Sequence, residues 1–292
     1  MPMNSKTMRM RTFHPEATAW RKAVIANSGT VSATTMRAVS NFCTAINAAG
    51  IRSKFLRLNL VCGHNLAAAR VPLYRGASAT GTQYGSAVDT NVGPLTSADY
   101  SEATGLQGDG SSKVLDCTIT IGTLKTFGTD FDNVHLSVYN RSLAGVVGPS
   151  FGAYDINGVY FNNGLGINSS SQPIYVGPTG PDFISGSTSA GDHDMVATSF
   201  ARGFHLAEFT AVAAGFYGIN GANVTGTIQN AGGLNFDATD TTPLYFLSDT
   251  YNYSSQLLSA YSCGLPMTSA ANRLAFATAM TAFQTALRRN VT

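Results

Sequence analysis

Between residues 80 and 263, hydrophobic and polar side chains alternate in short runs separated by turn-forming residues. In "LDCTITI", the apolar Cys117, Ile119 and Ile121 fall on one face of an extended chain and polar residues on the other. "VHLSVY", which begins at Val134, repeats this period of two. Gly, Asn, Asp or Pro separates most of the further runs, near residues 158–161, 173–176, 195–200, 205–212, 215–219, 243–248 and 256–262. The pattern predicts a mainly β fold, an antiparallel β-sandwich or jelly roll.

The two ends of the chain follow the helical spacing of three and four residues instead. Helices are predicted over residues 15–27 and 32–49, with shorter helical pieces around 52–61 and 64–71. Thr268 can cap a C-terminal helix, whose apolar stripe and final cations are Phe276, Met280, Phe283, Leu287, Arg288 and Arg289.

These patterns divide the chain into four parts, two of them helical. We predict a basic arm over residues 1–13, a helical anchoring segment over 14–79, a β-sandwich domain over 80–263 and a C-terminal helix within 264–292. The apolar stripe of that last helix has to be buried, and we expect it to pack on the anchoring segment. No apolar run approaches the roughly 20 residues that span a bilayer, so no membrane helix is expected.

The formal net charge of +2 hides an uneven distribution. Residues 1–75 hold eleven Lys or Arg against one acid, residues 76–263 hold four against fifteen acids, and the remainder adds three cations. One interpretation is a cationic end that docks on an acidic partner, with anchoring residues Lys6, Arg9, Arg11, Arg21 and Lys22. The other is that the basic helices are neutralised by their own acidic sandwich. Nucleic-acid binding is disfavoured, because the cations are spread over several helices without stacking aromatics.

The glycine-rich stretch "GLQGDGSSK", residues 105–113, has the look of a phosphate-binding loop but not its spacing. Ser111 and Ser112 separate the second glycine from Lys113, and a strand rather than a helix follows. We predict a turn at Asp109-Gly110 that leads into the strand. The four cysteines, at 43, 62, 117 and 263, form no C-x-x-C pair and have apolar neighbours, which predicts buried reduced thiols rather than disulfides or metal ligands.

Four segments occur in an order that resembles concanavalin A-like, or laminin-G-like, domains: "LQGDGSSKVLDCTI", "NVHLSVYNRS", "GFYGINGANV" and "TPLYFLSD". The closing "YSCGLPMTSAANRLAFATAMTAFQTAL" is similar to the strand and helix that end such domains. With its helical preface, the chain resembles virion proteins of tailed bacteriophages over roughly residues 84–290. It departs from the pattern at Gln107, where an aromatic is usual, at Tyr139, where Trp is common, and at Ser269-Ala270-Ala271, which lacks an acid.

The resemblance implies a non-enzymatic virion structural protein: a capsid decoration, fibre or tail component assembled in the host cytoplasm. Its partners would be other virion proteins, further copies of itself and a host-surface glycan, with neither nucleic acid nor membrane. Tyr and Asn side chains can stack on and hydrogen-bond to sugars, and the candidates are Tyr154, Tyr160, Asn162, Tyr251 and Tyr253. A free-standing lectin-like protein is the alternative.

A glycan-cleaving enzyme is the less favoured alternative. Retaining glycanases of this fold carry two glutamates on one strand face, spaced E-x-D-x-E, whereas the three glutamates here are isolated. Glu208 is expected to face solvent from its strand. No cofactor is expected except a calcium ion, which could use the oxygens of Asp130, Asp132 and Asn133 in the loop "TDFDN", since laminin-G-like domains sometimes bind calcium at their rims.

Overall fold

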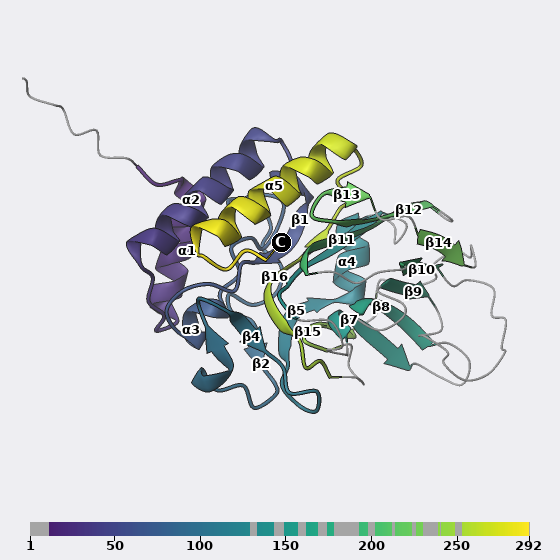
Figure 1. Ribbon diagram of the computed structural model, residues 1–292, viewed down its shortest axis with the longest axis horizontal. Coiled ribbons are helices and arrows are strands. Elements are labelled where there is room, and N and C mark those ends of the chain that lie inside the picture. Colours follow the sequence, from purple (N-terminus) through teal and green to yellow (C-terminus); the bar gives the residue numbers. More distant parts are fainter. Residues whose placement is uncertain are drawn as a thin grey trace, which may run out of the picture.

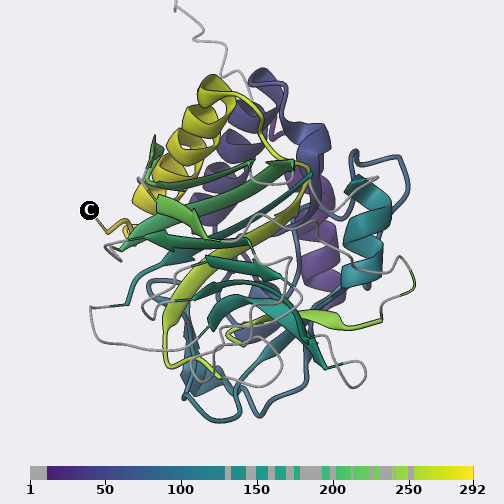
Figure 2. The ribbon, with the colours of Figure 1, turned by 90° about the vertical axis from the view of Figure 1, so that its right-hand side faces the viewer.

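A computed structural model shows a mainly β protein built of three layers (Figures 1 and 2). Three helices form a helical layer, an inner sheet lies beneath them, and an outer sheet lies beyond it. The structure describes residues 12–128, 133–142, 149–156, 162–168, 174–177, 193–197, 202–211, 214–223, 226–229, 239, 241–248 and 253–291. The predicted antiparallel, sandwich-like arrangement with a C-terminal helix is confirmed.

The inner sheet has the strand order β13-β12-β11-β6-β16-β4-β3, and β1 also pairs with β16. Neighbouring strands are antiparallel throughout. Its strands are β1 (Phe55–Asn59), β3 (Tyr100–Ser101), β4 (Gly105–Gln107), β6 (Val134–Asn140), β11 (Gly203–Ala211), β12 (Ala214–Ile219), β13 (Ala222–Asn223) and β16 (Leu257–Gly264).

The outer sheet has the order β14-β10-β9-β8-β7-β15-β5-β2, again with antiparallel neighbours. Its strands are β2 (Thr90–Asn91), β5 (Leu115–Thr120), β7 (Pro149–Ile156), β8 (Asn162–Asn168), β9 (Ile174–Gly177), β10 (His193–Ala197), β14 (Gly226–Gln229) and β15 (Pro243–Phe246). The alternation predicted for β5 is confirmed: Leu115, Cys117 and Ile119 are buried and the residues between them are half-buried. Ile121 departs from the prediction, because it begins the short helix α4 (Ile121–Gly128).

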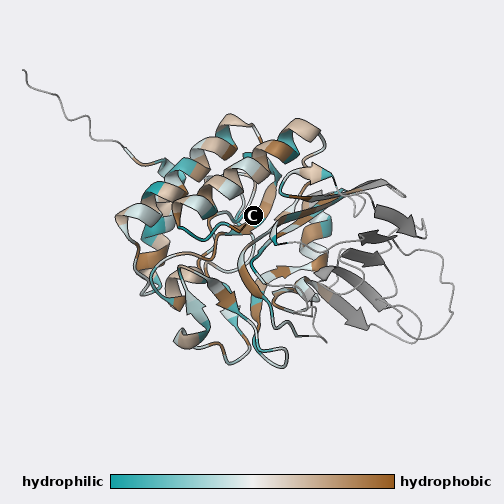
Figure 3. Ribbon diagram, in the orientation of Figure 1, coloured by the Kyte–Doolittle hydropathy of each residue, from teal (hydrophilic) through white to brown (hydrophobic). Residues whose placement is uncertain are grey.

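The helical layer consists of α1 (Pro15–Ala26), α2 (Ala33–Ala48) and α5 (Ala270–Ala286), and α5 packs against α2. Each helix carries both hydrophobic and hydrophilic residues (Figure 3). Ser32 and Ser269 cap α2 and α5, so the cap of the C-terminal helix is Ser269 and not Thr268 as expected. Smaller elements are the helix α3 (Leu66–Ala69) and the 3₁₀ turns Arg52–Lys54 and Ser97–Asp99. Within the described residues, no helix has the length and hydropathy needed to cross a membrane.

Two hydrophobic cores hold the layers together. The first lies between the two sheets and includes Leu115, Leu136 and Phe246, and the second lies between the helices and the inner sheet and includes Phe42 and Phe276. All seven residues of β6 are therefore buried, including the polar His135 and Ser137 that alternation places opposite the first core. The inner sheet is covered on both faces, which the alternating sequence did not reveal.

The predicted helix over residues 52–61 is wrong. Only Arg52–Lys54 form a helical turn, and Phe55–Asn59 form β1, which pairs with β16 in the inner sheet. This strand lies before the predicted sandwich boundary at residue 80, yet it joins a sheet otherwise built from residues after it. All five of its residues are buried, so it shows no alternation that could identify it as a strand.

Candidate binding pocket and cationic face

The turn at Asp109 is built by the carboxylate of that residue. Its Oδ1 atom accepts hydrogen bonds from the backbone N–H groups of Ser111, Ser112 and Lys113 at 2.9, 2.8 and 3.0 Å. Desolvation raises the pKa of Asp109, but these backbone hydrogen bonds outweigh it and lower the pKa overall. The amides that a phosphate would need are thus already bound to a carboxylate, and the predicted turn is confirmed.

This turn forms one wall of a pocket at the edge of the outer sheet. The pocket encloses about 230 Å³ and is lined by Val92, Ser112, Val114, Tyr245, Ser248 and Tyr253. Leu244 and Phe246 of β15 point into the core between the sheets, so Tyr245 between them points outward. The pocket therefore opens on the face of the outer sheet that is turned away from the helical layer.

Two phenol rings and two serines give this pocket mixed chemistry. Aromatic rings offer flat apolar faces, and hydroxyl groups both donate and accept hydrogen bonds, which suits a ligand that is polar at its edges and apolar on its faces. Desolvation raises the pKa of Tyr245, and the neighbouring Asp116 raises it further, so this phenol stays protonated and can donate.

The structure places the five sugar-binding candidates in different parts of the protein. Tyr253 lines the pocket. Tyr154 and Asn162 lie on the paired strands β7 and β8, and the structure describes their backbone but not their side chains. Tyr160 and Tyr251 lie outside the described residues. Sequence reasoning missed Tyr245, although the period of two in "PLYF" could have placed it on the outward face.

Of the three calcium candidates, one is among the described residues. Asn133 is half-buried directly before β6, and Asp130 and Asp132 lie outside the described residues.

The helical layer carries exposed cations. Arg21 and Lys22 on α1, Arg37 on α2 and Arg288 just after α5 are all exposed, and none forms an ion pair with the described residues. Glu16 is the only acid in the three helices, and Arg52 binds it at 2.6 Å. We call these four cations the cationic face. The other anchoring candidates, Lys6, Arg9 and Arg11, precede the described residues.

Other cations of the basic segments are used inside the protein. Arg57 binds Asp89 at 2.6 Å with both side chains fully buried, and Arg273 binds Glu208 at 2.7 Å. Neutralisation by acids of the same protein therefore holds for these two cations, and docking on an acidic partner stays a prediction. The expectation that Glu208 faces solvent is wrong: its carboxylate is buried and also accepts the backbone N–H of Met267 at 2.7 Å. The α5 segment covers this part of β11, and the alternating sequence alone gave no sign of that cover.

The four cysteines are buried and unpaired, as predicted. Burial raises the pKa of Cys43 and of Cys263 to about 12, so both remain thiols near neutral pH.

No protein-family model matches the chain, and no curated protein matches it by sequence. Among solved structures, Trypanosoma rangeli sialidase in complex with the inhibitor DANA aligns at 10% identity with a TM-score of 0.39, over 83% of this chain and 38% of that one. The same enzyme as its 2,3-difluorosialic acid covalent intermediate aligns at 12% identity with a TM-score of 0.38 and the same coverage. The chain spans less than two fifths of these enzymes, and a likeness this weak carries no argument about function.

Proposed function

We propose that this protein is a non-enzymatic structural component of a bacteriophage virion, such as a capsid decoration, fibre or tail protein. Its sandwich would be a concanavalin A-like jelly roll, as the ordered sequence motifs imply. The observation that carries the proposal is the cationic face of Arg21, Lys22, Arg37 and Arg288, which no acid of the helical layer neutralises. A surface of this kind is suited to docking on an acidic protein surface.

The arrangement of the layers supports this role. The four cations of the cationic face are exposed on the helical layer, and the pocket is lined by residues of the outer sheet and its loops. The inner sheet lies between these two layers (Figure 2). A protein docked through its helices would therefore leave the pocket exposed to the surroundings of the particle. The predicted basic arm, residues 1–13, would add Lys6, Arg9 and Arg11 to the docking end.

The environment of Glu208 supports a non-enzymatic role. Its carboxylate has no exposed surface and is held by Arg273 and the Met267 amide, so a glycan cannot reach it.

Quantitative mass spectrometry of purified particles tests the proposal. We expect the protein to be present at a fixed copy number per particle that matches a symmetric assembly. Recovery of the protein only in the soluble fraction of the lysed host, with none in the particles, would contradict it.

A second function, glycan binding, is favoured by the pocket that contains Tyr245 and Tyr253. We expect Tyr253→Ala in the full chain to weaken binding to a recognised glycan about fivefold, the loss of one aromatic contact of about 1 kcal/mol. The control is Phe13→Ala, which removes an exposed aromatic outside the pocket. Glycan binding would be contradicted if the wild-type protein bound nothing on a glycan array. It would also be contradicted if Tyr253→Ala and Phe13→Ala bound a recognised glycan equally well.

A further inference from the structure

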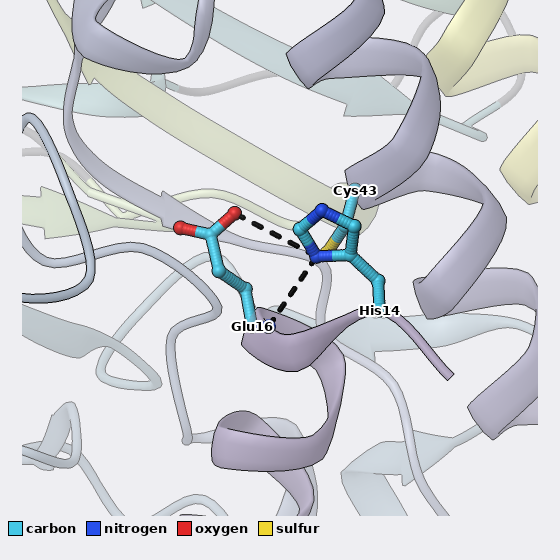
Figure 4. Close-up of side chains that lie close together, drawn as sticks. All are labelled: His14, Glu16 and Cys43. Carbon is cyan, nitrogen blue, oxygen red and sulfur yellow. Dashed lines mark hydrogen bonds and ion pairs between the residues drawn. The ribbon is translucent and has the colours of Figure 1, made fainter. Parts of the chain in front are cut away.

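Three side chains with different metal-ligating atoms converge where α1 meets α2. The Nδ1 atom of His14, a carboxylate oxygen of Glu16 and the Sγ atom of Cys43 all lie within 4.8 Å of one another (Figure 4). His14 caps α1 through its Nδ1 atom, which accepts the backbone N–H of Glu16 at 3.3 Å, and Cys43 lies on α2. A metal bond to Nδ1 would have to replace this long hydrogen bond. Their separation along the chain matches no metal-binding motif, so only the packing of the two helices brings them together.

The surrounding contacts hold these side chains in place. The backbone N–H of His14 donates to Ser40 Oγ at 2.8 Å, which ties the start of α1 to α2. Arg52 Nε donates to Glu16 Oε1 at 2.6 Å, and Asn47 Nδ2 donates to Oε2 at 3.1 Å. Oε2 lies 3.9 Å from His14 Nδ1. Arg52 thus orients the carboxylate through one oxygen, as outer hydrogen bonds do for metal ligands, and the second oxygen faces the histidine.

The hydroxyl of Tyr74, beside this cluster, is buried without a hydrogen bond to oxygen or nitrogen of the described residues. Tyr74 is 1% exposed, and its hydroxyl has no hydrogen-bond partner in the part of the chain that the structure describes. Burial raises the pKa of Tyr74, and the neighbouring Cys43 thiol and Glu16 carboxylate raise it further. The Cys43 thiol beside the hydroxyl can act as a weak hydrogen-bond partner. Leaving a buried hydroxyl unsatisfied costs about 1–3 kcal/mol, so a polar ligand at this position would remove a real penalty.

We propose that His14, Glu16 and Cys43 bind a zinc ion, with a water molecule in the fourth position that hydrogen-bonds to the Tyr74 hydroxyl. Imidazole, carboxylate and thiolate are the three ligand types that zinc takes in proteins. Zinc bond lengths imply ligand atoms roughly 3.4–3.6 Å apart, so separations of up to 4.8 Å have to shorten by up to about 1.4 Å. This proposal departs from the sequence-based prediction for Cys43 alone, since that prediction took all four cysteines as free thiols.

Zinc binding would release one proton from the protein. The thiol of Cys43 loses its proton to solvent as the zinc–sulfur bond forms, and the thiolate and the Glu16 carboxylate together neutralise the two charges of the ion. Arg52 keeps its contact with the other carboxylate oxygen. The site would clamp the start of α1 to α2 directly beside the basic arm, and it would rigidify the end of the protein that carries the cationic face.

Cobalt substitution of the full-length, chelator-treated protein tests the site, because a cobalt–thiolate bond gives a near-ultraviolet charge-transfer absorption that oxygen and nitrogen ligands alone do not give. We expect this band to saturate at one cobalt per chain and to disappear when zinc is added. We expect Cys43→Ser to abolish the band and His14→Ala to weaken cobalt binding at least tenfold.

Cys62→Ser is the matched control, because Cys62 is also a buried free thiol but lies outside the cluster, and it should keep the band. If Cys43→Ser fails to fold, His14→Ala and Glu16→Gln decide, since both positions are only partly buried. No band at saturating cobalt, or a band that His14→Ala and Glu16→Gln leave at wild-type affinity, overturns the proposal.

Discussion

Asp89→Asn is expected to lower the free energy of unfolding by about 3–5 kcal/mol, the cost of leaving a buried charge without its partner. Asp89 and Arg57 are both fully buried, and Arg57 donates to Asp89 Oδ1 through Nε at 3.0 Å and through Nη2 at 2.6 Å. The second oxygen accepts from Asn59 at 2.7 Å and from the Tyr261 hydroxyl at 2.7 Å. Asparagine preserves the shape of this network and removes its only negative charge.

The loss should extend beyond one ion pair, because the network joins separate parts of the fold. Arg57 and Asn59 belong to β1, Tyr261 belongs to β16, and Asp89 directly precedes β2 of the outer sheet. Burial acts to lower the pKa of Arg57, but Asp89 and the other neighbours outweigh it and raise that pKa overall. Because an arginine guanidinium keeps its charge in proteins, Asp89→Asn would leave this charge buried without its partner.

Urea unfolding measures this effect, and Asp99→Asn is its matched control. Asp99 binds Lys113 at 2.6 Å near the surface, where an ion pair contributes about 0–1 kcal/mol. The same change of residue type should therefore cost several times more at position 89 than at position 99. Equal and small losses at both positions would show that the Arg57–Asp89 pair does not support the fold.

Arg289→Met is expected to cost about 2–4 kcal/mol of unfolding free energy. The buried guanidinium donates to the backbone carbonyl oxygens of Leu60, Val61, Glu102 and Ser259 and to Gln284 Oε1, at 2.6–3.2 Å. Methionine fills a similar volume but leaves these acceptors unsatisfied, at about 1–3 kcal/mol for each that water cannot reach. Removing a costly buried charge offsets part of that loss.

The control for this prediction is the preceding residue. Arg288 is exposed and forms no ion pair with the described residues, so Arg288→Met should change stability by less than about 0.5 kcal/mol. Thermal or urea unfolding of the two variants side by side measures the difference. Indistinguishable stabilities would contradict the role of Arg289 as the link between α5 and the sheets.

Strands and helices that are buried on one face could be predicted, because their pattern of apolar and polar residues matches the side that each face takes in the fold. β5 alternates in sequence and is buried on one face, and α2 and α5 carry apolar stripes that pack as expected. The inner sheet could not be predicted in the same way. Covered on both faces, it holds charged residues such as Arg57 and Glu208, whose partners lie 32 and 65 residues away. A charged residue in the sequence therefore suggested a solvent-exposed position, whereas the fold buries these residues beside a residue of opposite charge.

The candidate sites also depend on contacts between residues far apart in the sequence, which the sequence alone does not predict. Arg288 and Arg289 are equivalent as two terminal cations of a helix, and only the packing of α5 separates an exposed charge from a buried one. Tyr253 was found by residue type, but Val92, Ser112 and Val114 reach the pocket from two segments more than a hundred residues away. His14 and Cys43 lie on different helices, so no local motif could mark them as a pair.

The most direct test of the central claim, that the helical layer docks this protein onto a particle through its cations, is the copy number of a charge-reversed variant. We expect R21E/K22E/R37E to fall at least tenfold in purified particles relative to wild type, while the charge-conserving R21K/K22R/R37K and the sandwich variant R202E remain incorporated. All these residues are exposed, so folding should be unaffected. Wild-type incorporation of R21E/K22E/R37E would contradict the claim.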